Sequence, residues 1–584
     1  MKKFVADFET ATWLEDETYV WAWALCNIED PDEIIIGNTI ESFFEKIQEE
    51  NYIIYFHNLK FDASFIIDYL LKNDYVHIED KNERRDKTFS TLISDMGIFY
   101  SVEIYFKVSG KVIKRVSIFD SLKIIPISVD GIPDAFGIPY TKLNLDYNRP
   151  REKGYILKPY EERYIKNDVK IVALALKEMF NENLTKMTIG SNALANFKKT
   201  KGLYFKRLFP EINLELYEDL KKAYKGGFTF LNKIYEEKDN EETIILDVNS
   251  LYPSQMRYKP MPYGEPIFYK GEYKEDKIYP LYIQRLCCSF ELKSGKIPTI
   301  QIKGRPFFQE NEYLESSNGE VIALTLTNID LKLFLENYNV YNLEYWSGWK
   351  FKALNGIFDE YIDYWISVKN EATLENNKGK RQIAKLMLNS LYGKFASKMK
   401  GQNKIPYLEN GKVLYKLSDE EERKGVYIPI GAFITSYARE VTIRTSGLIK
   451  EYSLNKYGID KYIYSDTDSI HTTLSIEELS QFCDIDPVRL GAWKHEGTAR
   501  RSKFIRQKTY LEEIFNKKTN EWEVKITCAG MPKSCYKYVE WNTFKQGFTC
   551  KGKLTYKQVK GGVKLVDTDF TIKSDKLKKN FKKF

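Results

Sequence analysis

The chain has 584 residues, of which 43% are hydrophobic and 15% aromatic, and its formal net charge is +7. This length predicts at least two domains, and the apolar content is ample for sizeable cores. The lack of a long apolar run excludes a membrane span, and the start Met1-Lys2-Lys3-Phe4-Val5-Ala6-Asp7 puts a charge where a signal peptide needs its apolar core, so we expect a soluble intracellular protein. The seven cysteines contain no C-x-x-C pair, which favours reduced thiols over a structural zinc site.

An acidic pair lies on the first predicted strand, Lys3 to Thr10. Asp7 and Glu9 are two residues apart, so both side chains leave the same face of the strand. Two carboxylates on one face repel each other unless a cation lies between them. The pattern therefore favours a metal site near the amino terminus, although each acid taken singly is more often a surface residue.

Two further acids lie on predicted helices. The strand predicted from Asn51 to Phe56 leads into a helical pattern, and Asp62 lies near that junction, a usual location for ligands in α/β sheets. In the helix predicted from Tyr160 to Phe180, Tyr164 and Asp168 are four residues apart and share a face. The four acids together predict a site for two Mg²⁺ or Mn²⁺ ions about 4 Å apart, which would activate water and stabilise a leaving oxygen. Tyr164 is expected to orient that water.

Paired glycines follow in Tyr224-Lys225-Gly226-Gly227-Phe228, at the end of a segment rich in Asn, Lys and Gly. Glycine permits either a sharp turn or the close approach of backbone to a ligand. The sequence alone leaves both interpretations open.

A second set of acids lies in the remaining two thirds of the chain. Asp247 ends the apolar strand predicted from Thr243 to Leu246, while Lys461 to His471 reads as a strand, a tight turn and a second strand around Asp466 and Asp468. Hard oxygen ligands suit Mg²⁺. The predicted metal ligands are Asp247, Asp468, the Val248 carbonyl and, in an assisting role, Asp466.

Between these acids, Ser367 to Met399 is predicted to be helical with an interruption near Asn376 to Gly379. One face carries a polar, cationic stripe formed by Arg381, Lys385, Asn389 and Tyr392. Such a stripe can neutralise a triphosphate, and Tyr392 can stack on a base pair. The order of acid, lysine-bearing helix and paired acid is typical of a template-directed nucleic-acid polymerase.

Three further features fit that interpretation. Tyr252 is expected to pack beneath an incoming sugar and to exclude a 2′-hydroxyl, with a core tyrosine as the alternative. Lys508-Thr509-Tyr510 joins a cation to an aromatic ring at strand spacing and is expected to grip a primer strand. The segment Met531 to Phe584 holds 14 lysines and four acidic residues, which suits contact with phosphates.

Taken in order, the motifs resemble those of protein-primed family B DNA polymerases from small tailed phages of Bacillus-type hosts, over essentially the whole chain. The nuclease part by itself resembles the DEDD-type 3′–5′ exonucleases. The matching segments are Asp7-Phe8-Glu9-Thr10, Asn58-x-x-Phe61-Asp62, Tyr164-x-x-x-Asp168, Tyr224-x-Gly226-Gly227, Asp247-x-x-Ser250-Leu251-Tyr252-Pro253, Lys385-x-x-x-Asn389-Ser390-x-Tyr392-Gly393, Tyr464-x-Asp466-x-Asp468-Ser469 and Lys508-x-Tyr510.

The resemblance implies an α/β and α+β multidomain fold: a ribonuclease H-like 3′–5′ exonuclease domain, then a right-hand polymerase of palm, fingers and thumb with two insertions. The implied boundaries are 1–186 for the exonuclease, 187–260 and 427–530 for the palm, 261–358 for an insertion that contacts a priming terminal protein, 359–395 for the fingers, 396–426 for a hairpin insertion and 531–584 for the thumb. In relatives the hairpin insertion helps to encircle DNA, which gives processivity and strand displacement. Glu409-Asn410-Gly411-Lys412 predicts its turn.

The resemblance also implies roles for individual residues. Lys142 would assist the nuclease site. The implied DNA contacts are Asn58, Phe61, Ser121, Leu122 and Tyr147 along a single-strand path, and Tyr224, Gly226, Gly227, Lys508 and Tyr510 in the polymerase part. The implied nucleotide contacts are Tyr252, Lys369, Arg381, Lys385, Asn389 and Tyr392. The loop from Asn370 to Lys380 looks longer than in relatives, which leaves the direction of Lys369 open.

The implied partners are template and primer DNA, deoxynucleoside triphosphates and a terminal protein bound as a heterodimer, with the chain otherwise a monomer in the cytoplasm of a bacterial host. Two Mg²⁺ or Mn²⁺ ions are expected in each active site. Two alternatives stay open: a family B polymerase that uses ordinary nucleic-acid primers, and a DNA-binding scaffold whose sites are relics.

Overall fold

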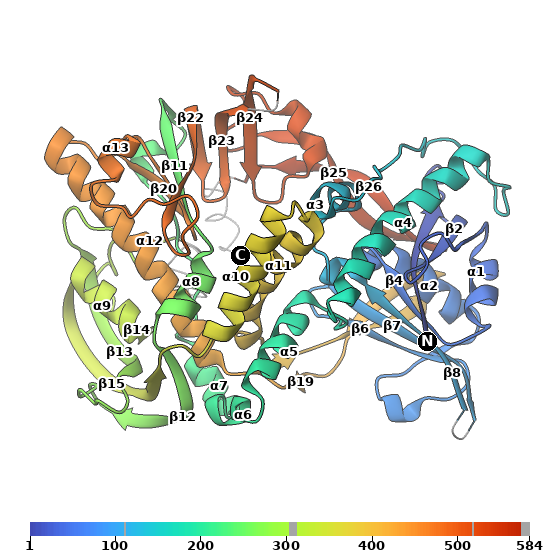
Figure 1. Cartoon of the computed structure of the whole chain (residues 1–584), viewed down its shortest axis with the longest axis horizontal. Helices are drawn as coiled ribbons and strands as arrows, with labels where there is room; N and C mark the ends of the chain where they lie inside the picture. The colour runs from blue at the N-terminus through green and yellow to red at the C-terminus, as the bar shows by residue number, and fades with distance from the viewer. Residues whose placement is uncertain (110–111, 303–311, 517–518, 574–584) are drawn as a thin grey trace.

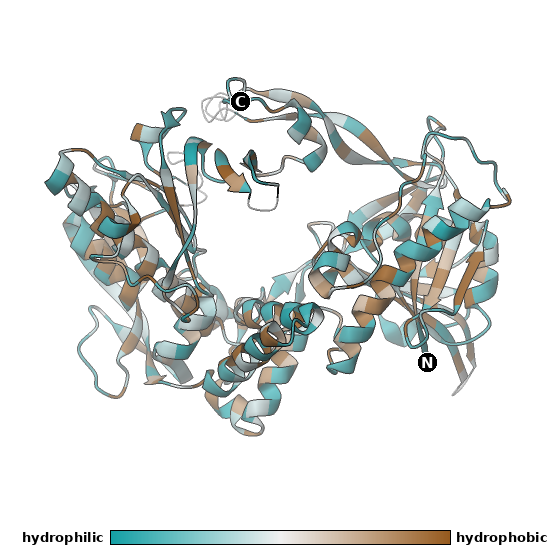
Figure 2. Ribbon diagram, turned by 45° about the horizontal axis from the view of Figure 1, so that its top comes forward, coloured by the Kyte–Doolittle hydropathy of each residue, from teal (hydrophilic) through white to brown (hydrophobic). Residues whose placement is uncertain are grey.

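Two separate β-sheets lie on opposite sides of the molecule, with a pair of helices between them (Figure 1). The computed structural model describes residues 1–109, 112–302, 312–516 and 519–573. Apolar residues concentrate on the strands and the inward faces of the helices in both halves (Figure 2). The chain therefore builds more than one core, as its length predicts.

The amino-terminal domain contains a mixed sheet in the order β3-β2-β1-β4-β8-β7-β6-β5. Strand β1 pairs antiparallel with β2 and parallel with β4, which pairs parallel with β8. This arrangement confirms the predicted ribonuclease H-like sheet. Its elements are β1 (Lys2–Thr10), β2 (Val20–Asn27), β3 (Ile34–Gly37), α1 (Ile40–Ile47), β4 (Tyr52–Phe56), α2 (Leu59–Lys72), β5 (Val76–His77), η1 (Lys81–Glu83), β6 (Thr88–Ile93), β7 (Phe99–Ser109), β8 (Val112–Asp120), η2 (Ser121–Lys123), η3 (Val129–Gly131), α3 (Ile132–Phe136) and α4 (Pro159–Asn181).

The second large sheet has the order β24-β23-β22-β11-β21-β20-β9, with β10 paired to β22. The long helix α12 packs on it, and helices α5 to α7 connect it to the amino-terminal domain. Its elements and the connecting helices are α5 (Ile189–Lys201), α6 (Tyr204–Leu208), α7 (Leu214–Lys221), β9 (Thr229–Leu231), η4 (Lys233–Tyr235), β10 (Asp239–Asn240), β11 (Thr243–Val248), α8 (Leu251–Tyr258), α12 (Ile428–Tyr457), β20 (Tyr462–Asp466), β21 (Ser469–Thr472), α13 (Ile476–Leu479), β22 (Trp493–Arg506), β23 (Thr509–Asn516) and β24 (Glu521–Cys528).

The segment predicted to be the first insertion forms a sheet of its own, in the order β12-β15-β13-β14. One face carries helix α9 over a separate cluster of buried residues that includes Leu286, Phe290 and Phe334. Its elements are β12 (Met261–Lys270), β13 (Leu281–Leu292), β14 (Ile322–Thr327), α9 (Asn328–Asn337) and β15 (Tyr338–Leu354).

The helical pair between the two large sheets consists of α10 (Asp359–Leu374) and α11 (Lys378–Phe395). The predicted interruption is present, but the helix before it runs to Leu374, so most of the expected Asn370 to Lys380 loop is helical. Lys369 consequently lies within a helix, and its direction is set by that helix rather than by a long loop.

Two hairpins reach the amino-terminal domain from the other half of the chain. The first joins β17 (Lys404–Glu409) to β18 (Lys412–Leu417) through Asn410 and Gly411, both at positive φ, which confirms the predicted turn. The second joins β25 (Thr549–Val559) to β26 (Gly562–Thr571), and near its tip the Thr18 N–H donates to the Lys560 carbonyl at 2.9 Å. The remaining short elements are β16 (Lys400–Gly401), β19 (Glu421–Glu422) and η5 (Lys533–Tyr538).

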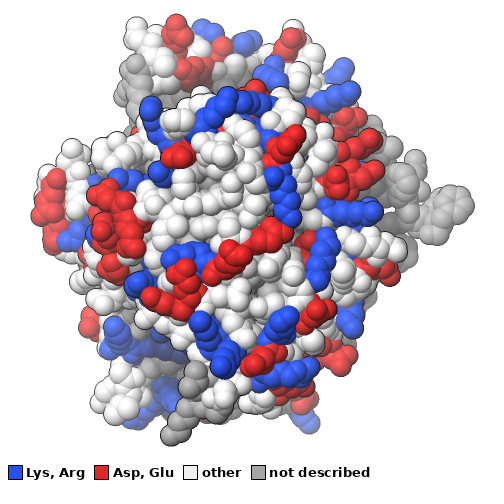
Figure 3. All heavy atoms as spheres, turned by 90° about the vertical axis from the view of Figure 1, so that its right-hand side faces the viewer, with Lys and Arg blue, Asp and Glu red and all other residues white. Residues whose placement is uncertain are grey.

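The molecular surface over the amino-terminal side carries interspersed Lys, Arg, Asp and Glu rather than a field of one sign (Figure 3). All seven cysteines are buried, each with a free thiol. Among the residues that the structure describes, no helix has the length and apolar character required to cross a bilayer.

Candidate active sites

The predicted acids of the second sheet meet where β11 lies beside the β20–β21 hairpin. Asp247 is opposite Ser469 in the β11–β21 register, and the Val248 N–H donates to the Asp468 carbonyl at 2.8 Å. Thr467, at φ 59°, makes the turn that reverses the chain after Asp466. The sequence therefore places Asp247 and Asp468 next to each other through strand pairing.

The electrostatics of this pair fit a cation site. Burial, followed by repulsion from Asp468 and Glu496, raises the pKa of Asp247 to about 7. Burial also raises the pKa of Asp468, with Asp466 and Glu496 adding to the shift. Lys494 and Lys385 act in the opposite direction on Asp247.

Sequence reasoning missed Glu496. The β11–β22 register pairs Ile245 with Gly497 but Leu246 with His495, so Glu496 is the extra residue of a β-bulge. A bulge re-aims a side chain out of the regular alternation. The bulge brings Glu496 within electrostatic reach of both aspartates, and no motif in the sequence signals it.

Asp466 is held differently from its neighbours. Its Oδ1 accepts a hydrogen bond from the Thr229 hydroxyl at 3.0 Å and lies 3.0 Å from the Lys508 Nζ. Lys508 itself corrects the sequence interpretation, because it is at φ 56° in the tight turn between β22 and β23 and not on a strand. Tyr510 does lie on β23.

The paired glycines form the backbone that faces this turn. A Cβ added to Gly227 would lie 2.5 Å from the Thr467 Oγ1, and the Thr467 N–H donates to the Phe228 carbonyl at 2.7 Å. Gly227 therefore packs closely against a side chain of this chain, and the approach of its backbone to a ligand stays a prediction. Arg439, another residue that sequence reasoning missed, is buried and donates to the carbonyls of Lys225 and Gly226 at 2.8 and 2.7 Å.

The cationic stripe predicted on α11 is present, with Arg381, Lys385 and Asn389 exposed on one face. Lys369 lies close enough to Arg381, Lys385 and Lys494 that, after burial, these cations lower its pKa. Lys369 and Arg381 therefore belong to the same group of cations as Lys385 and Lys494, the two that act on Asp247.

Aromatic rings lie between the stripe and the acids. The rings of Tyr252 and Tyr392 are 4.2 Å apart between centroids, with an interplanar angle of 31°. Burial raises the pKa of Tyr252, and Tyr392, Tyr224 and Asp468 contribute to that rise. The three tyrosines thus line one region beside Asp468.

In the amino-terminal domain the four predicted acids also come together. Asp7 and Glu9 lie on β1, Asp62 lies in the first turn of α2, and Asp168 lies on α4 beside the Lys142 Nζ at 3.3 Å. Asn58 caps α2 at φ 76°, which turns the chain sharply after β4.

Burial dominates the charge state of this cluster. It raises the pKa of Asp7 to about 7, with Asp168 adding to the rise and Lys142 opposing it. The pKa values of Glu9 and Asp62 are raised well above their usual range by burial first and by Asp7 next. Arg151, paired with Glu161 at 2.7 Å, is a further cation that acts on Glu9 and that sequence reasoning missed.

The other residues predicted to serve the nuclease site differ in how exposed they are. Tyr164 is buried and its hydroxyl lies 2.6 Å from that of Tyr147, which is 45% exposed. Phe61 and Leu122 are partly exposed, and the Asn58 side chain donates to the Tyr556 hydroxyl at 3.2 Å. Ser121 departs from the expectation of a DNA-contacting side chain, because it is fully buried and its hydroxyl donates to the Phe56 carbonyl.

The donor chemistry of the amino-terminal cluster suits divalent cations. Asp62 Oδ1 and Asp168 Oδ1 are buried without a hydrogen-bond partner in the described structure, and such oxygens are costly unless a cation binds them. Across the described residues, no three His, Cys, Asp or Glu side chains are arranged to hold one metal ion together.

Comparison with known proteins shows the family of the whole chain. The chain matches the family model of DNA polymerase type B, organellar and viral, over residues 44–163 and 148–484. It is 43% identical to the DNA polymerase of Bacillus phage M2 over 591 residues, covering 98% of this chain and 100% of that protein. The DNA polymerase of Streptococcus phage Cp-1 is 33% identical over 596 residues, 98% of each chain. The solved phi29 DNA polymerase complexed with primer-template DNA and incoming nucleotide substrates matches with a TM-score of 0.90 at 42% identity, over 98% of this chain and 100% of that one.

Proposed function

The chain belongs to the organellar and viral type B DNA polymerases, and we propose that this DNA polymerase starts from a protein hydroxyl and proofreads with its amino-terminal domain. The observation that carries the proofreading part is the presence of two acidic clusters, one on each large sheet, whereas the priming part rests on the resemblance of the whole chain to protein-primed polymerases. A single cluster would serve synthesis alone.

For synthesis, Asp247, Asp468 and the Val248 carbonyl would hold two Mg²⁺ or Mn²⁺ ions, with Asp466 in support. Ions bound there would lower the pKa of the primer hydroxyl and neutralise the leaving pyrophosphate. The raised pKa values of both aspartates support this role, because a bound cation relieves their repulsion. Glu496 adds negative charge to the same site.

For nucleotide binding, the cations on α10 and α11 would neutralise the triphosphate. Their closeness to Lys494 supports this assignment, because an anion bound among these cations would relieve their mutual repulsion. Tyr252 and Tyr392 would enclose the sugar and base, and the ring of Tyr252 would exclude a 2′-hydroxyl. The proposed nucleotide contacts are Tyr252, Lys369, Arg381, Lys385, Asn389 and Tyr392.

For primer and template, Lys508, Tyr510, Tyr224 and the Gly226-Gly227 backbone would contact DNA. The tight packing of Gly227 on the Thr467 turn couples that backbone to the acids. The match to the phi29 polymerase complexed with primer-template DNA and incoming nucleotides supports the same partners for this chain.

For proofreading, the nuclease acids would hold two divalent cations, and Lys142 would balance their charge. Tyr164 would orient water, and its short contact with Tyr147 fixes the hydroxyl for that task. The single-strand path would run along Asn58, Phe61, Leu122 and Tyr147, while the fully buried Ser121 would offer the strand no surface.

The domain assignment follows the predicted boundaries: 1–186 exonuclease, 187–260 and 427–530 palm, 261–358 terminal-protein insertion, 359–395 fingers, 396–426 hairpin insertion and 531–584 thumb. The two hairpins that reach the amino-terminal domain support an enclosing, processive and strand-displacing enzyme. We place the polymerase in the cytoplasm of a bacterial host, bound to its terminal protein as a heterodimer and otherwise monomeric.

The testing experiment has two arms. In the first, the enzyme extends a primer on a single-stranded circle with Mg²⁺ and deoxynucleotides alone, and we expect product many times the circle length. In the second, the enzyme, its terminal protein, template and labelled dATP are combined, and we expect a covalent protein–nucleotide product. Long product without the covalent product would favour a polymerase that uses ordinary nucleic-acid primers.

A further inference from the structure

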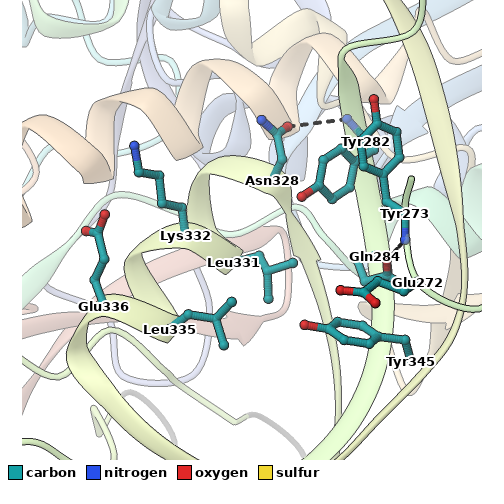
Figure 4. A pocket seen from close by; sticks show the side chains of 10 residues that line it. All are labelled: Glu272, Tyr273, Tyr282, Gln284, Asn328, Leu331, Lys332, Leu335, Glu336 and Tyr345. Atoms are coloured by element: carbon teal, nitrogen blue, oxygen red, sulfur yellow. Dashed lines mark hydrogen bonds between the residues drawn. The ribbon is translucent and has the colours of Figure 1, made fainter. Parts of the chain in front are cut away.

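A cavity of ≈ 510 Å³ lies beside helix α9 of the first insertion (Figure 4). The faces of its stacked tyrosines, Tyr273 and Tyr282, cover each other at a centroid distance of 3.8 Å, and its acid Glu272 is exposed to solvent. These side chains select no particular ligand. A charged side chain sealed inside the protein implies a more specific role, and Arg151 in the amino-terminal domain is such a side chain.

Arg151 lies on the loop that joins α3 to α4, residues 137–158, which contains no helix or strand. Every residue of this loop is described, and Arg151 is the only one that is buried. The same loop carries Lys142 and Tyr147 to the nuclease site. A long surface loop without a core of its own needs an anchor, and here the anchor is a guanidinium rather than an apolar side chain.

The guanidinium of Arg151 binds one carboxylate and two carbonyls. Its Nε donates to Glu161 Oε1 at 2.7 Å, and both side chains are 0% exposed. Its Nη1 donates to the carbonyls of Asp146 and Arg149, both at 2.9 Å. The central carbon of the guanidinium lies 4.4 Å from the centroid of the Trp21 ring. A planar group with several fixed donors can make these contacts together, whereas the single ammonium of a lysine cannot.

These contacts connect the loop to the helix that bears Tyr164. Glu161 lies in the first turn of α4, three residues before Tyr164. The Asp146 carbonyl belongs to the peptide that leads into Tyr147, so Arg151 fixes the direction in which Tyr147 leaves the backbone. The Tyr147 hydroxyl lies 2.6 Å from the Tyr164 hydroxyl. One buried ion pair therefore sets how the two tyrosines meet.

We propose that Arg151 is a positioning residue of the nuclease site: anchored by Glu161, it holds the loop so that the Tyr147 hydroxyl meets that of Tyr164. The inference rests on the proposed proofreading, in which Tyr164 orients the attacking water. Without its hydroxyl partner, Tyr164 would be free to turn, and a displacement of about 1 Å at such a site can lower the rate by up to about 10²-fold.

The test compares degradation of a single-stranded oligonucleotide in Mg²⁺ with synthesis on a primed template, both by the full-length enzyme. Arg151→Lys keeps the positive charge but loses the planar set of donors. It should lower the kcat of degradation by about tenfold and leave the rate of synthesis unchanged. Arg163→Lys, the same substitution at an exposed position of α4, should degrade DNA as the unaltered enzyme does.

A double-mutant cycle with Tyr147→Phe separates positioning from general stabilisation of the domain. Tyr147→Phe removes the hydroxyl that Arg151 would place, so adding Arg151→Lys to it should cost less than about twofold more. Equal losses of kcat in the two backgrounds would show that Arg151 acts independently of Tyr147 and would overturn the inference.

Glu161→Gln weakens the same anchor from its other side and serves where Arg151→Lys does not fold. It should lower the kcat of degradation by about threefold, because a charge-assisted hydrogen bond becomes a neutral one, and again only where the Tyr147 hydroxyl is present. Unchanged degradation by both folded variants overturns the inference and leaves proofreading intact. If the unaltered enzyme degrades no single-stranded DNA in Mg²⁺, proofreading and this inference fall together.

Discussion

The two acidic clusters differ in how their negative charge is balanced. In the amino-terminal cluster Glu9, Asp62 and Asp168 are 5%, 3% and 4% exposed and Asp7 is half-buried, and the cations that act on Glu9 are Lys142 and Arg151, of which Arg151 is already paired with Glu161. At the Asp247–Asp468 pair the acids are half-buried, and cations on α10, α11 and β22 lie near them. The amino-terminal cluster is therefore mainly acidic, whereas the site around Asp247 and Asp468 combines carboxylates with lysine and arginine side chains.

The difference matches the charge of what each site would bind. A nuclease site holds a strand that carries one negative charge per phosphate, and its metal ions can supply most of the positive charge. A triphosphate brings several charges at once, so fixed lysines and arginines are needed beside the metal ligands. The contrast therefore predicts that the two activities can be removed separately.

The sharpest test of that separation is Asp468→Ala. Loss of a principal metal ligand should reduce nucleotide incorporation by about 10³-fold or more, because it removes transition-state stabilisation rather than uniform binding. Degradation of single-stranded DNA should continue at the unaltered rate. Both rates are measured on the same labelled oligonucleotide, with and without deoxynucleotides.

The reciprocal variant is Asp7→Ala combined with Glu9→Ala, which should stop degradation and spare synthesis. If either variant, shown to be folded by its melting transition, lost both activities, the two-site assignment would be wrong.

A second prediction concerns the sugar. Tyr252→Val should raise incorporation of ribonucleotides relative to deoxyribonucleotides by about 10²-fold, because the ring that would meet a 2′-hydroxyl is removed. The Tyr252 ring packs on Tyr392, so Tyr252→Phe, which keeps that contact, is the matched control. An unchanged ratio in Tyr252→Val would reject the steric role.

How far the sequence determines these sites depends on whether a residue belongs to a local pattern. Strand β1, helix α4 and the Asn410-Gly411 turn were predictable because periodicity and turn chemistry are local. Asp247 and Asp468 were predictable because motif order links them across more than 200 residues of sequence.

The unpredicted features arise from tertiary register. Glu496 reaches the acids only because a bulge interrupts the β11–β22 ladder, and Arg439 reaches the Gly226 carbonyl from the middle of a helix distant in sequence. Lys508 was placed on a strand, yet the hairpin between β22 and β23 puts it in the turn. Sequence spacing does not contain these pairings.

Gly227 tests whether backbone packing sets the geometry of the acids. Gly227→Ala would place a methyl group 2.5 Å from the Thr467 Oγ1, which must displace the turn. We expect synthesis to fall by about tenfold and nuclease activity to stay unchanged. Adding Thr467→Ala removes two of the three contacting atoms, so the double variant should recover part of the lost synthesis. If Gly227→Ala alone is as active as the unaltered enzyme, the packing argument is contradicted.

A pH prediction tests the charge state of the amino-terminal cluster in the absence of metal. The pKa of Asp7 is raised from 3.8 to about 7 in the folded chain, so the folded state holds its proton more tightly than the unfolded state. Without divalent metal, stability should therefore fall as pH rises through this interval. Asp7→Asn removes that contribution and should raise the melting temperature at pH 7.5 in EDTA by about 2 °C. Saturating Mg²⁺ should stabilise the unaltered protein more than the variant, and equal melting curves in EDTA would contradict the assigned shift.

The smallest expected effect is at Lys508. This lysine is not a proposed metal ligand, but its Nζ lies 3.0 Å from Asp466 Oδ1. Lys508→Ala removes one phosphate-binding cation, so primer-template affinity should drop by about three- to tenfold, and the slope of log affinity against log salt should decrease by about 1. Lys525→Ala is the matched control, because its side chain is 59% exposed, against 55% for Lys508, but lies beside Glu512 rather than Asp466. Lys508→Ala also frees Asp466 from its ion pair, which leaves the Asp466 carboxylate available for metal. A weaker affinity with an unchanged salt slope would therefore place the role of Lys508 at Asp466 rather than at the DNA.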